Sequence, residues 1–147
     1  MLRIDRLRTE YASEVAKLEG IVFGRDAWTE EDFIEAANLD YAYYITVWDN
    51  EILVGACGLR NMCGDGFITN VMVREGFRRQ GVAEMMLSEL MLRCRSMGVR
   101  NYTLEVRASN VPAIGLYEKL GFVKEGIRPD FYSYPDEDAI IMWRRIS

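Results

Sequence analysis

The sequence contains no histidine, and only three cysteines and three prolines among its 147 residues. Without histidine, Ser-His-Asp and Cys-His catalysis are excluded, and the commonest metal ligand is missing. Cys57, Cys63 and Cys94 are widely spaced and form no C-x-x-C pair, so the pattern indicates neither a disulfide framework nor a zinc site. We therefore expect reduced thiols, no metal, and proton transfer by Glu, Asp, Tyr, Lys, Cys or water.

Long apolar runs are also missing. The longest, such as residues 139–143, are far too short to span a bilayer, and residues 1–20 mix charged with apolar residues instead of forming a signal peptide. We expect a cytoplasmic protein with no membrane partner. Half of the residues are apolar, and a chain of this length suits one compact domain over residues 1–147.

Negative charge is concentrated in the first half of the chain. The formal net charge is −5, which argues against a nucleic-acid partner. Residues 1–66 carry 6 Lys and Arg against 13 Asp and Glu, a net −7, whereas residues 67–147 carry 12 against 10, a net +2. The halves are predicted to face different partners, although ordinary scatter of surface charge is the alternative.

The first half predicts two helices and a hairpin. Residues 2–7 alternate as a short strand does, and Thr9 is a candidate N-cap for a helix that runs to about residue 22. Thr29, followed by three acidic residues, predicts the start of a second helix. Strands are expected at residues 41–48, 51–60 and 67–73, with turns at Asp49-Asn50 and at residues 63–66.

The second half alternates strands and helices. Apolar spacing predicts a helix over residues 82–97, ended by Gly98, and a second helix that begins at Asn110 and ends at Gly121. Further strands are expected at residues 101–106, 122–127 and 139–146. This order predicts a mixed α/β fold in which a mixed, mostly antiparallel, twisted sheet carries helices on both faces.

The turn before the first of these helices is a candidate phosphate site. Arg78-Arg79-Gln80-Gly81-Val82-Ala83 leads from a strand into the helix, and Gly81 and Ala83 leave the backbone uncovered. The first N–H groups of a helix have no intrahelical partner and favour an anion, so a pyrophosphate would fit there. Arg78 and Arg79 would add charge at the rim. A plain tight turn is the alternative, and the Walker A and G-x-G-x-x-G motifs are missing.

Glu105 is a candidate general base. Thr103, Glu105 and Arg107 share one face of their predicted strand, opposite Tyr102 and two aliphatic residues. If the strand lies inside the sheet, Glu105 points into a cleft and can take a proton directly or through water. The alternative is an ion pair between Glu105 and an arginine.

Several other residues have a structural and a functional interpretation. Asn110 is ordinarily an N-cap, and Tyr117 is a core aromatic or the acid that protonates a leaving group. Trp28 and Phe33 are satellite core or a wall of a substrate cleft. The methionines of the helix are expected to fill the core, namely Met85, Met86 and Met91.

Taken together, these segments resemble the GNAT superfamily of N-acetyltransferases, whose Q/R-x-x-G-x-G/A motif is met by Arg78, Gly81 and Ala83. Further matching segments are Leu104-Glu105-Val106-Arg107-Ala108-Ser109-Asn110, Ala113-Ile114, Leu116-Tyr117-Glu118, Leu120-Gly121-Phe122 and Glu137-Asp138-Ala139-Ile140-Ile141-Met142. With Phe23, Trp28-Thr29 and Phe33, they resemble the RimI-type ribosomal-protein-alanine N-acetyltransferases in particular.

The resemblance implies acetyl-CoA as co-substrate and assigns the site residues. The backbone of Val71, Met72 and Val73 would pair with the pantetheine arm. The pyrophosphate would be held by the N–H groups of Arg79, Gln80, Gly81, Val82, Ala83 and Glu84. Asn110 would bind the cofactor arm, Glu105 would accept the proton of the amine, and Tyr117 would protonate the departing thiolate.

The implied reaction is direct transfer in a ternary complex to the N-terminal α-amine of a protein, such as the alanine of basic small-subunit ribosomal protein eighteen. Residues 67–147 would bind acetyl-CoA and residues 1–66 the substrate. An α-amine with a pKa near 7.8 is about one-seventh neutral at pH 7, far more than a lysine near 10.4. The alternatives are acetylation of a lysine side chain or small amine, and a non-catalytic acyl-CoA-binding sensor, against which Glu105 and Tyr117 together argue.

Overall fold

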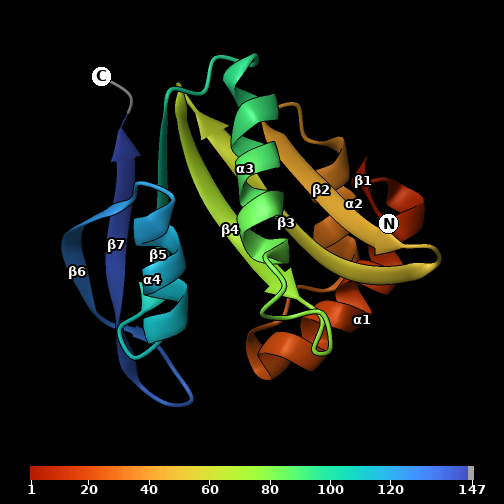
Figure 1. Ribbon diagram of the computed structural model, residues 1–147. Coiled ribbons are helices and arrows are strands. Elements are labelled where there is room, and N and C mark those ends of the chain that lie inside the picture. Colours follow the sequence, from red (N-terminus) through yellow and green to blue (C-terminus); the bar gives the residue numbers. More distant parts are fainter. Residues whose placement is uncertain (146–147) are drawn as a thin grey trace.

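The structure is a computed structural model that describes residues 1–145, in which one seven-stranded sheet is flanked by four α-helices (Figure 1). The strands are β1 (Leu2–Arg6), β2 (Ala42–Asp49), β3 (Ile52–Met62), β4 (Asp65–Val73), β5 (Asn101–Arg107), β6 (Val123–Tyr132) and β7 (Glu137–Arg145). The helices are α1 (Ala12–Phe23), α2 (Glu30–Asn38), α3 (Val82–Arg95) and α4 (Val111–Lys119), with 3₁₀ turns η1 (Thr9–Tyr11) and η2 (Gly24–Asp26).

The sheet has the order β1-β2-β3-β4-β5-β7-β6, and the β4–β5 pair is parallel while the other pairs are antiparallel. The predicted mixed, mostly antiparallel sheet is thereby confirmed. β4 and β5 pair only where residues 65–67 face residues 101–103. Beyond that point the two strands diverge and split the sheet into two wings (Figure 1).

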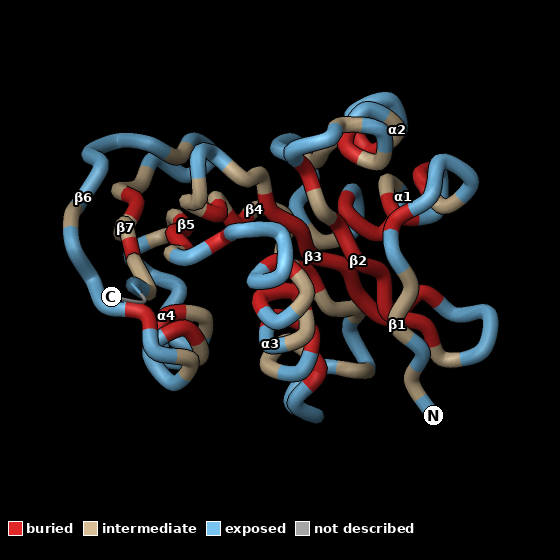
Figure 2. The backbone as a smooth tube through the Cα atoms, turned by 90° about the horizontal axis from the view of Figure 1, so that it is seen from above, coloured by how far each residue is buried: buried red, intermediate tan, exposed pale blue. Residues whose placement is uncertain are grey.

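Helices cover both faces of the sheet, as the sequence predicts. One core cluster joins α1 and α2 to the sheet through residues such as Leu18 and Phe33. The other joins α3 and α4 to the opposite face through residues such as Leu87, Leu90 and Ile114. Figure 2 shows the buried segments concentrated along the central strands between these two layers. Each fully buried leucine contributes about 1.5–3 kcal/mol of hydrophobic stabilisation.

The two predicted helix starts of the first half have different outcomes. Thr29 begins α2 as expected, because its hydroxyl accepts from the Asp32 N–H at 3.2 Å and the Asp32 carboxylate accepts from the Thr29 N–H at 2.9 Å. The prediction that Thr9 caps a helix is wrong. Thr9 lies inside η1, its hydroxyl accepts from the Asn38 side chain at 3.3 Å, and α1 begins only at Ala12.

Other boundaries also differ from the predictions. β6 begins one residue later than expected and runs to Tyr132, and α3 ends at Arg95. The expected end of the last strand at Ile146 lies outside the described residues. Met86 and Met91 are core residues as predicted, whereas Met85 is exposed. None of the helices described over residues 1–145 is long and apolar enough to cross a membrane.

Candidate active site

The split between β4 and β5 places Val71, Met72 and Val73 where β4 no longer pairs with β5. On its other side this stretch still pairs with β3, and a Cβ on Gly55 would come within 2.6 Å of the Met72 carbonyl oxygen. Asn70 has a φ of 54° at the register shift of β4, so the strand bulges as it enters the split. The β5-facing backbone edge of Val71–Val73 is thus free of a β5 partner.

The start of α3 has the geometry of an anion site. Gly81 is the N-cap with a φ of 78°, a conformation that favours glycine, and no side chain caps the helix. The first N–H groups therefore lack both an intrahelical and a capping partner. Arg78 donates from Nε to the Val73 carbonyl at 2.9 Å and Gln80 donates to the Gly76 carbonyl at 3.2 Å. Both side chains thereby fix the turn.

Glu105 lies on β5 beyond the last β4–β5 pair, with its side chain 11% exposed. Its Oε2 atom is 2.8 Å from Nε of Arg128, an ion pair whose angle does not make a hydrogen bond. The arginine partner that the sequence offered as the alternative is therefore present, and it comes from β6. The role of Glu105 as a base stays a prediction, because an ion pair and proton transfer do not exclude each other.

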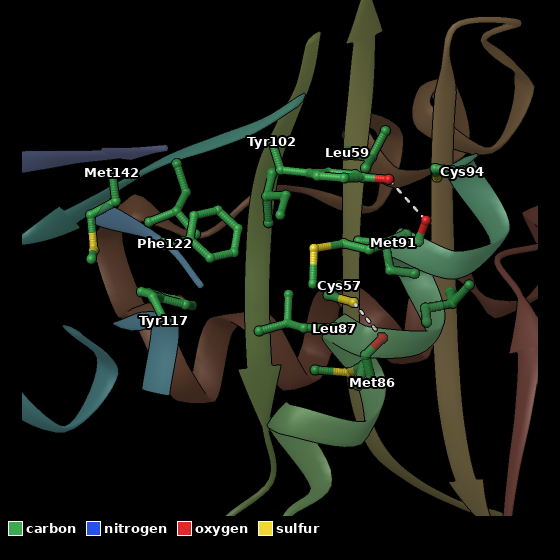
Figure 3. Close-up of a cluster of buried hydrophobic side chains, with 14 of the residues drawn as sticks. Cys57, Leu59, Met86, Leu87, Met91, Cys94, Tyr102, Tyr117, Phe122 and Met142 are labelled. Atoms are coloured by element: carbon green, nitrogen blue, oxygen red, sulfur yellow. Dashed lines mark hydrogen bonds between the residues drawn. The ribbon is translucent and has the colours of Figure 1, made fainter. Parts of the chain in front are cut away.

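Tyr117 is buried in α4, with its ring centroid 6.0 Å from that of Phe122. Figure 3 shows Tyr117 and Phe122 together on the α4 side of the cluster, with Cys57 and Leu87 on the side of α3. Burial, and next the nearby Cys57, raise the pKa of the Tyr117 phenol. The hydroxyl therefore stays protonated at neutral pH, as an acid that protonates a thiolate must.

Asn110 caps α4, because its Oδ1 atom accepts from the Ala113 N–H at 3.2 Å. The structural interpretation of Asn110 is confirmed, and its contact with the cofactor arm stays a prediction. The neighbouring Ser109 N–H donates to Oε2 of Glu137 at 2.6 Å, which ties the start of α4 to β7.

Two of the three cysteines are placed unfavourably for a covalent route. Cys57 and Cys94 are buried. Burial raises the pKa of both thiols, that of Cys94 to about 12. Since the thiolate is the reactive form, neither is an activated nucleophile.

Sequence reasoning missed Glu19, a carboxylate of α1 that is only 1% exposed. It accepts from the Trp28 N–H at 2.5 Å and from the side-chain amide of Asn70 at 2.9 and 3.2 Å. Glu19 thus ties the connection between α1 and α2 to the bulge of β4. The signal was available, because Glu19 follows the core residues Ala12 and Val15 at helical spacing and is a charge on the apolar face of α1.

Trp28 and Phe33 belong to the α1–α2 core, which confirms the satellite-core interpretation. Their ring centroids are 5.2 Å apart, and Trp28 also lies 5.7 Å from the ring of Tyr44. Phe33 is fully buried, whereas Trp28 is half-buried next to Glu19 and Asn70. Trp28 is thus partly accessible, and its place in a wall of a substrate cleft stays a prediction.

A split sheet with an open strand edge, an uncapped helix start and a carboxylate beside the gap agrees with the coenzyme A-dependent transferase that the sequence predicts. Residues 5–122 match the model of the Acetyltransferase (GNAT) family. The chain belongs to this family, and it is an acetyl-CoA-dependent acetyltransferase.

Relatives and solved structures agree with this assignment. A Bacillus subtilis protein provisionally named as a ribosomal protein bS18-alanine N-acetyltransferase is 34% identical over 98% of this chain and 95% of its own length. The Escherichia coli (strain K12) ribosomal protein bS18-alanine N-acetyltransferase is 34% identical over 82% of each chain. The crystal structure of the Escherichia coli ribosomal-protein-S18-alanine N-acetyltransferase superposes with a TM-score of 0.89 and 30% identity, over 100% of this chain and 95% of that one.

Proposed function

We propose that this acetyltransferase acts on the N-terminal α-amine of a protein, and that its acceptor is the N-terminal alanine of ribosomal protein bS18 in the cytoplasm. The observation that carries the proposal is the similarity to the Escherichia coli enzyme, which extends over 82% of this chain in sequence and all of it in structure. The matched part includes both wings of the split sheet, where acetyl-CoA and the acceptor would meet.

Acetyl-CoA would lie along the split on the side of residues 67–147. The free edge of Val71–Val73 supports pairing with the pantetheine amides. The Val73 carbonyl is already bonded to Arg78, which leaves its N–H and the other backbone groups of this edge. The uncapped backbone from Arg79 to Glu84 would bind the pyrophosphate, and Asn110 would contact the arm from the start of α4.

The acceptor would enter from the opposite side, where residues 1–66 contribute α1, α2 and Trp28. The neutral amine would attack the thioester carbonyl directly, and Glu105 would accept the amine proton through a water molecule. Tyr117 would donate its proton to the sulfur of the departing coenzyme A. This mechanism suits an α-amine, because about one-seventh of it is neutral at pH 7 and a moderate base then suffices.

The test is mass spectrometry of peptides after incubation with acetyl-CoA. We expect acetylation of an Ala-Arg-leading basic peptide at its α-amine. The same peptide with its N-terminus already acetylated, and carrying an internal lysine, serves as the control, together with spermidine. Faster acetylation of spermidine or of the internal lysine would replace the N-terminal assignment by a small amine or lysine acceptor.

A further inference from the structure

We propose that Arg107 is a positioning residue that holds the acceptor side of the site together. The proposal rests on the proposed function, since it concerns how the acceptor is received. Arg107 ends β5, two residues beyond Glu105 on the same face of the strand, and its side chain is 26% exposed. Its contacts, and not its charge or its position at a strand end, distinguish Arg107 from the other arginines of the sheet.

The guanidinium of Arg107 fixes the turn between β6 and β7. Nη1 donates to the Pro135 carbonyl at 2.9 Å and to Oε1 of Glu137 at 3.2 Å, while Nη2 donates to the Ser133 carbonyl at 2.9 Å. The two terminal nitrogens of one planar guanidinium thus bind two carbonyls of the turn and the carboxylate of the first residue of β7. A lysine offers a point charge and cannot reproduce this geometry.

The same guanidinium connects the turn to Glu105. Its central carbon lies 4.5 Å from the ring centroid of Tyr132, the last residue of β6. Burial, and next the negative charge of Glu105, raise the pKa of Tyr132, as expected for a phenol close to that carboxylate. Arg128, which pairs with Glu105, lies on the same strand four residues earlier. Movement of the turn would therefore move two of the groups that surround Glu105.

Arg107 also reaches the other wing of the sheet. Its Nη2 atom is 4.0 Å from Oδ2 of Asp26 in η2, and the neighbouring Arg25 places its guanidinium carbon 4.4 Å from the ring centroid of Tyr134. These contacts join the α1–α2 connection to the β6–β7 turn. The α1–α2 connection is held at its other end by Glu19 through Trp28. Each exposed pair of this kind contributes little to the free energy of unfolding. We therefore expect these contacts to fix the positions of the two segments without adding much to overall stability.

From these contacts we infer that loss of Arg107 loosens the β6–β7 turn and the α1–α2 connection and leaves the acetyl-CoA side unchanged. The residues assigned to acetyl-CoA are on β4, at the turn into α3 and at the start of α4, and none of them contacts the Arg107 guanidinium in the described structure. The one link is Glu137, whose other carboxylate oxygen accepts from the Ser109 N–H beside Asn110, a hydrogen bond that does not use the guanidinium. Replacing a residue that only supported the fold would instead weaken the binding of both substrates or lower the unfolding temperature.

The test compares Arg107→Met and Arg107→Lys with the wild-type enzyme, using as acceptor whichever amine the wild type acetylates fastest. We expect Arg107→Met to lower kcat/KM for the acceptor by about 10 to 100-fold, the range that a small misplacement of a site can cost. Most of this loss should come from a rise in the KM of the acceptor. The Kd of acetyl-CoA should change by no more than about twofold, well below the tenfold change that about 1.4 kcal/mol of binding free energy corresponds to. Arg107→Lys should be intermediate because it restores charge without the fork.

The matched control is Arg145→Gln, which removes an arginine that pairs with Glu125 at the far end of β7. This variant should leave both substrates unaffected. Equal losses in Arg145→Gln and Arg107→Met, an unchanged acceptor KM, or a parallel loss of acetyl-CoA affinity would overturn the proposal.

Hydrogen exchange keeps the proposal testable even if the acceptor is not a peptide N-terminus. In Arg107→Met we expect faster amide exchange in residues 132–137 and in residues 24–28 together, and no change in residues 79–84. Faster exchange in residues 132–137 alone would show that Arg107 does not link the two wings and would overturn the proposal. Failure of the peptide assay in the wild type would instead count against the proposed function.

Discussion

At the scale of single residues, Tyr117 has a buried ring that packs on Phe122 and a hydroxyl whose pKa burial raises. Tyr117→Phe keeps the ring, so we expect little change in unfolding temperature but a fall in turnover of about 10² to 10⁴-fold, typical of a lost general acid. Tyr102→Phe is the control, because the buried Tyr102 hydroxyl donates to the Met91 carbonyl at 2.8 Å and serves no proposed chemistry. It should cost about 0.5–1.5 kcal/mol of stability and no turnover. Normal turnover of Tyr117→Phe would leave only the core interpretation.

Glu105 is the second residue whose role one substitution tests, because its ion pair with Arg128 offers a purely structural alternative. Glu105→Gln is expected to lower turnover by about 10² to 10⁴-fold while acetyl-CoA affinity is retained. The loss should shrink at high pH, where more of the amine arrives neutral. Arg128→Gln breaks the ion pair but keeps the carboxylate. An equal loss in both variants, measured by steady-state kinetics across pH, would assign the effect to the ion pair.

At the scale of elements, two substitutions of Gly81, the N-cap of α3, distinguish the effect of backbone strain from an effect on cofactor binding. Any side chain at its φ of 78° strains the backbone, although no atom lies within 4 Å of a Cβ placed there. Gly81→Ala and Gly81→Glu share this strain, and only the glutamate adds a negative charge at the proposed pyrophosphate site. Calorimetry should therefore show a weaker acetyl-CoA affinity in Gly81→Glu than in Gly81→Ala. Equal affinities in the two variants would place the pyrophosphate elsewhere.

The elements also show how far the sequence alone could lead. Thr29 was predicted correctly because its capping box is complete within four residues, whereas Thr9 failed because its hydroxyl bonds to Asn38, 29 positions away. β6 extends through Pro129 because β6 is an edge strand and Pro129 lies in the register shift between Arg128 and Tyr132, so proline interrupts no ladder bond. The turn at Gly81 and the face of β5 on which Glu105 lies depend on residues close in the sequence, and the structure has both. The pairing of Glu105 with Arg128 depends on β7 lying between β5 and β6, an order that spacing along the chain does not reveal.

At the scale of the whole molecule, the acidic first half includes α2, whose exposed acids begin two residues after Trp28, on the proposed acceptor side. Exposed charges attract a basic peptide mainly during encounter, so they should raise apparent affinity without changing the chemical step. We expect kcat/KM for a basic acceptor peptide to fall as salt shortens the screening length from about 10 Å at 0.1 M to about 3 Å at 1 M. Turnover at saturation and kcat/KM for an acidic peptide should not show this fall.

Charge-reversal variants show which acidic residues attract the basic acceptor peptide. Glu31 lies in the first turn of α2, beside the proposed acceptor side, whereas Asp40 lies beyond the other end of the helix and is also exposed. The two variants compared are Glu31→Lys and Asp40→Lys. We expect Glu31→Lys to weaken the salt dependence and lower kcat/KM for the basic peptide, because a repulsive charge replaces an attractive one near the entrance. Asp40→Lys should have a smaller effect, because its charge is more strongly screened at that distance. If both variants lower kcat/KM equally, net charge attracts the peptide and the acids of α2 have no special place in its recognition.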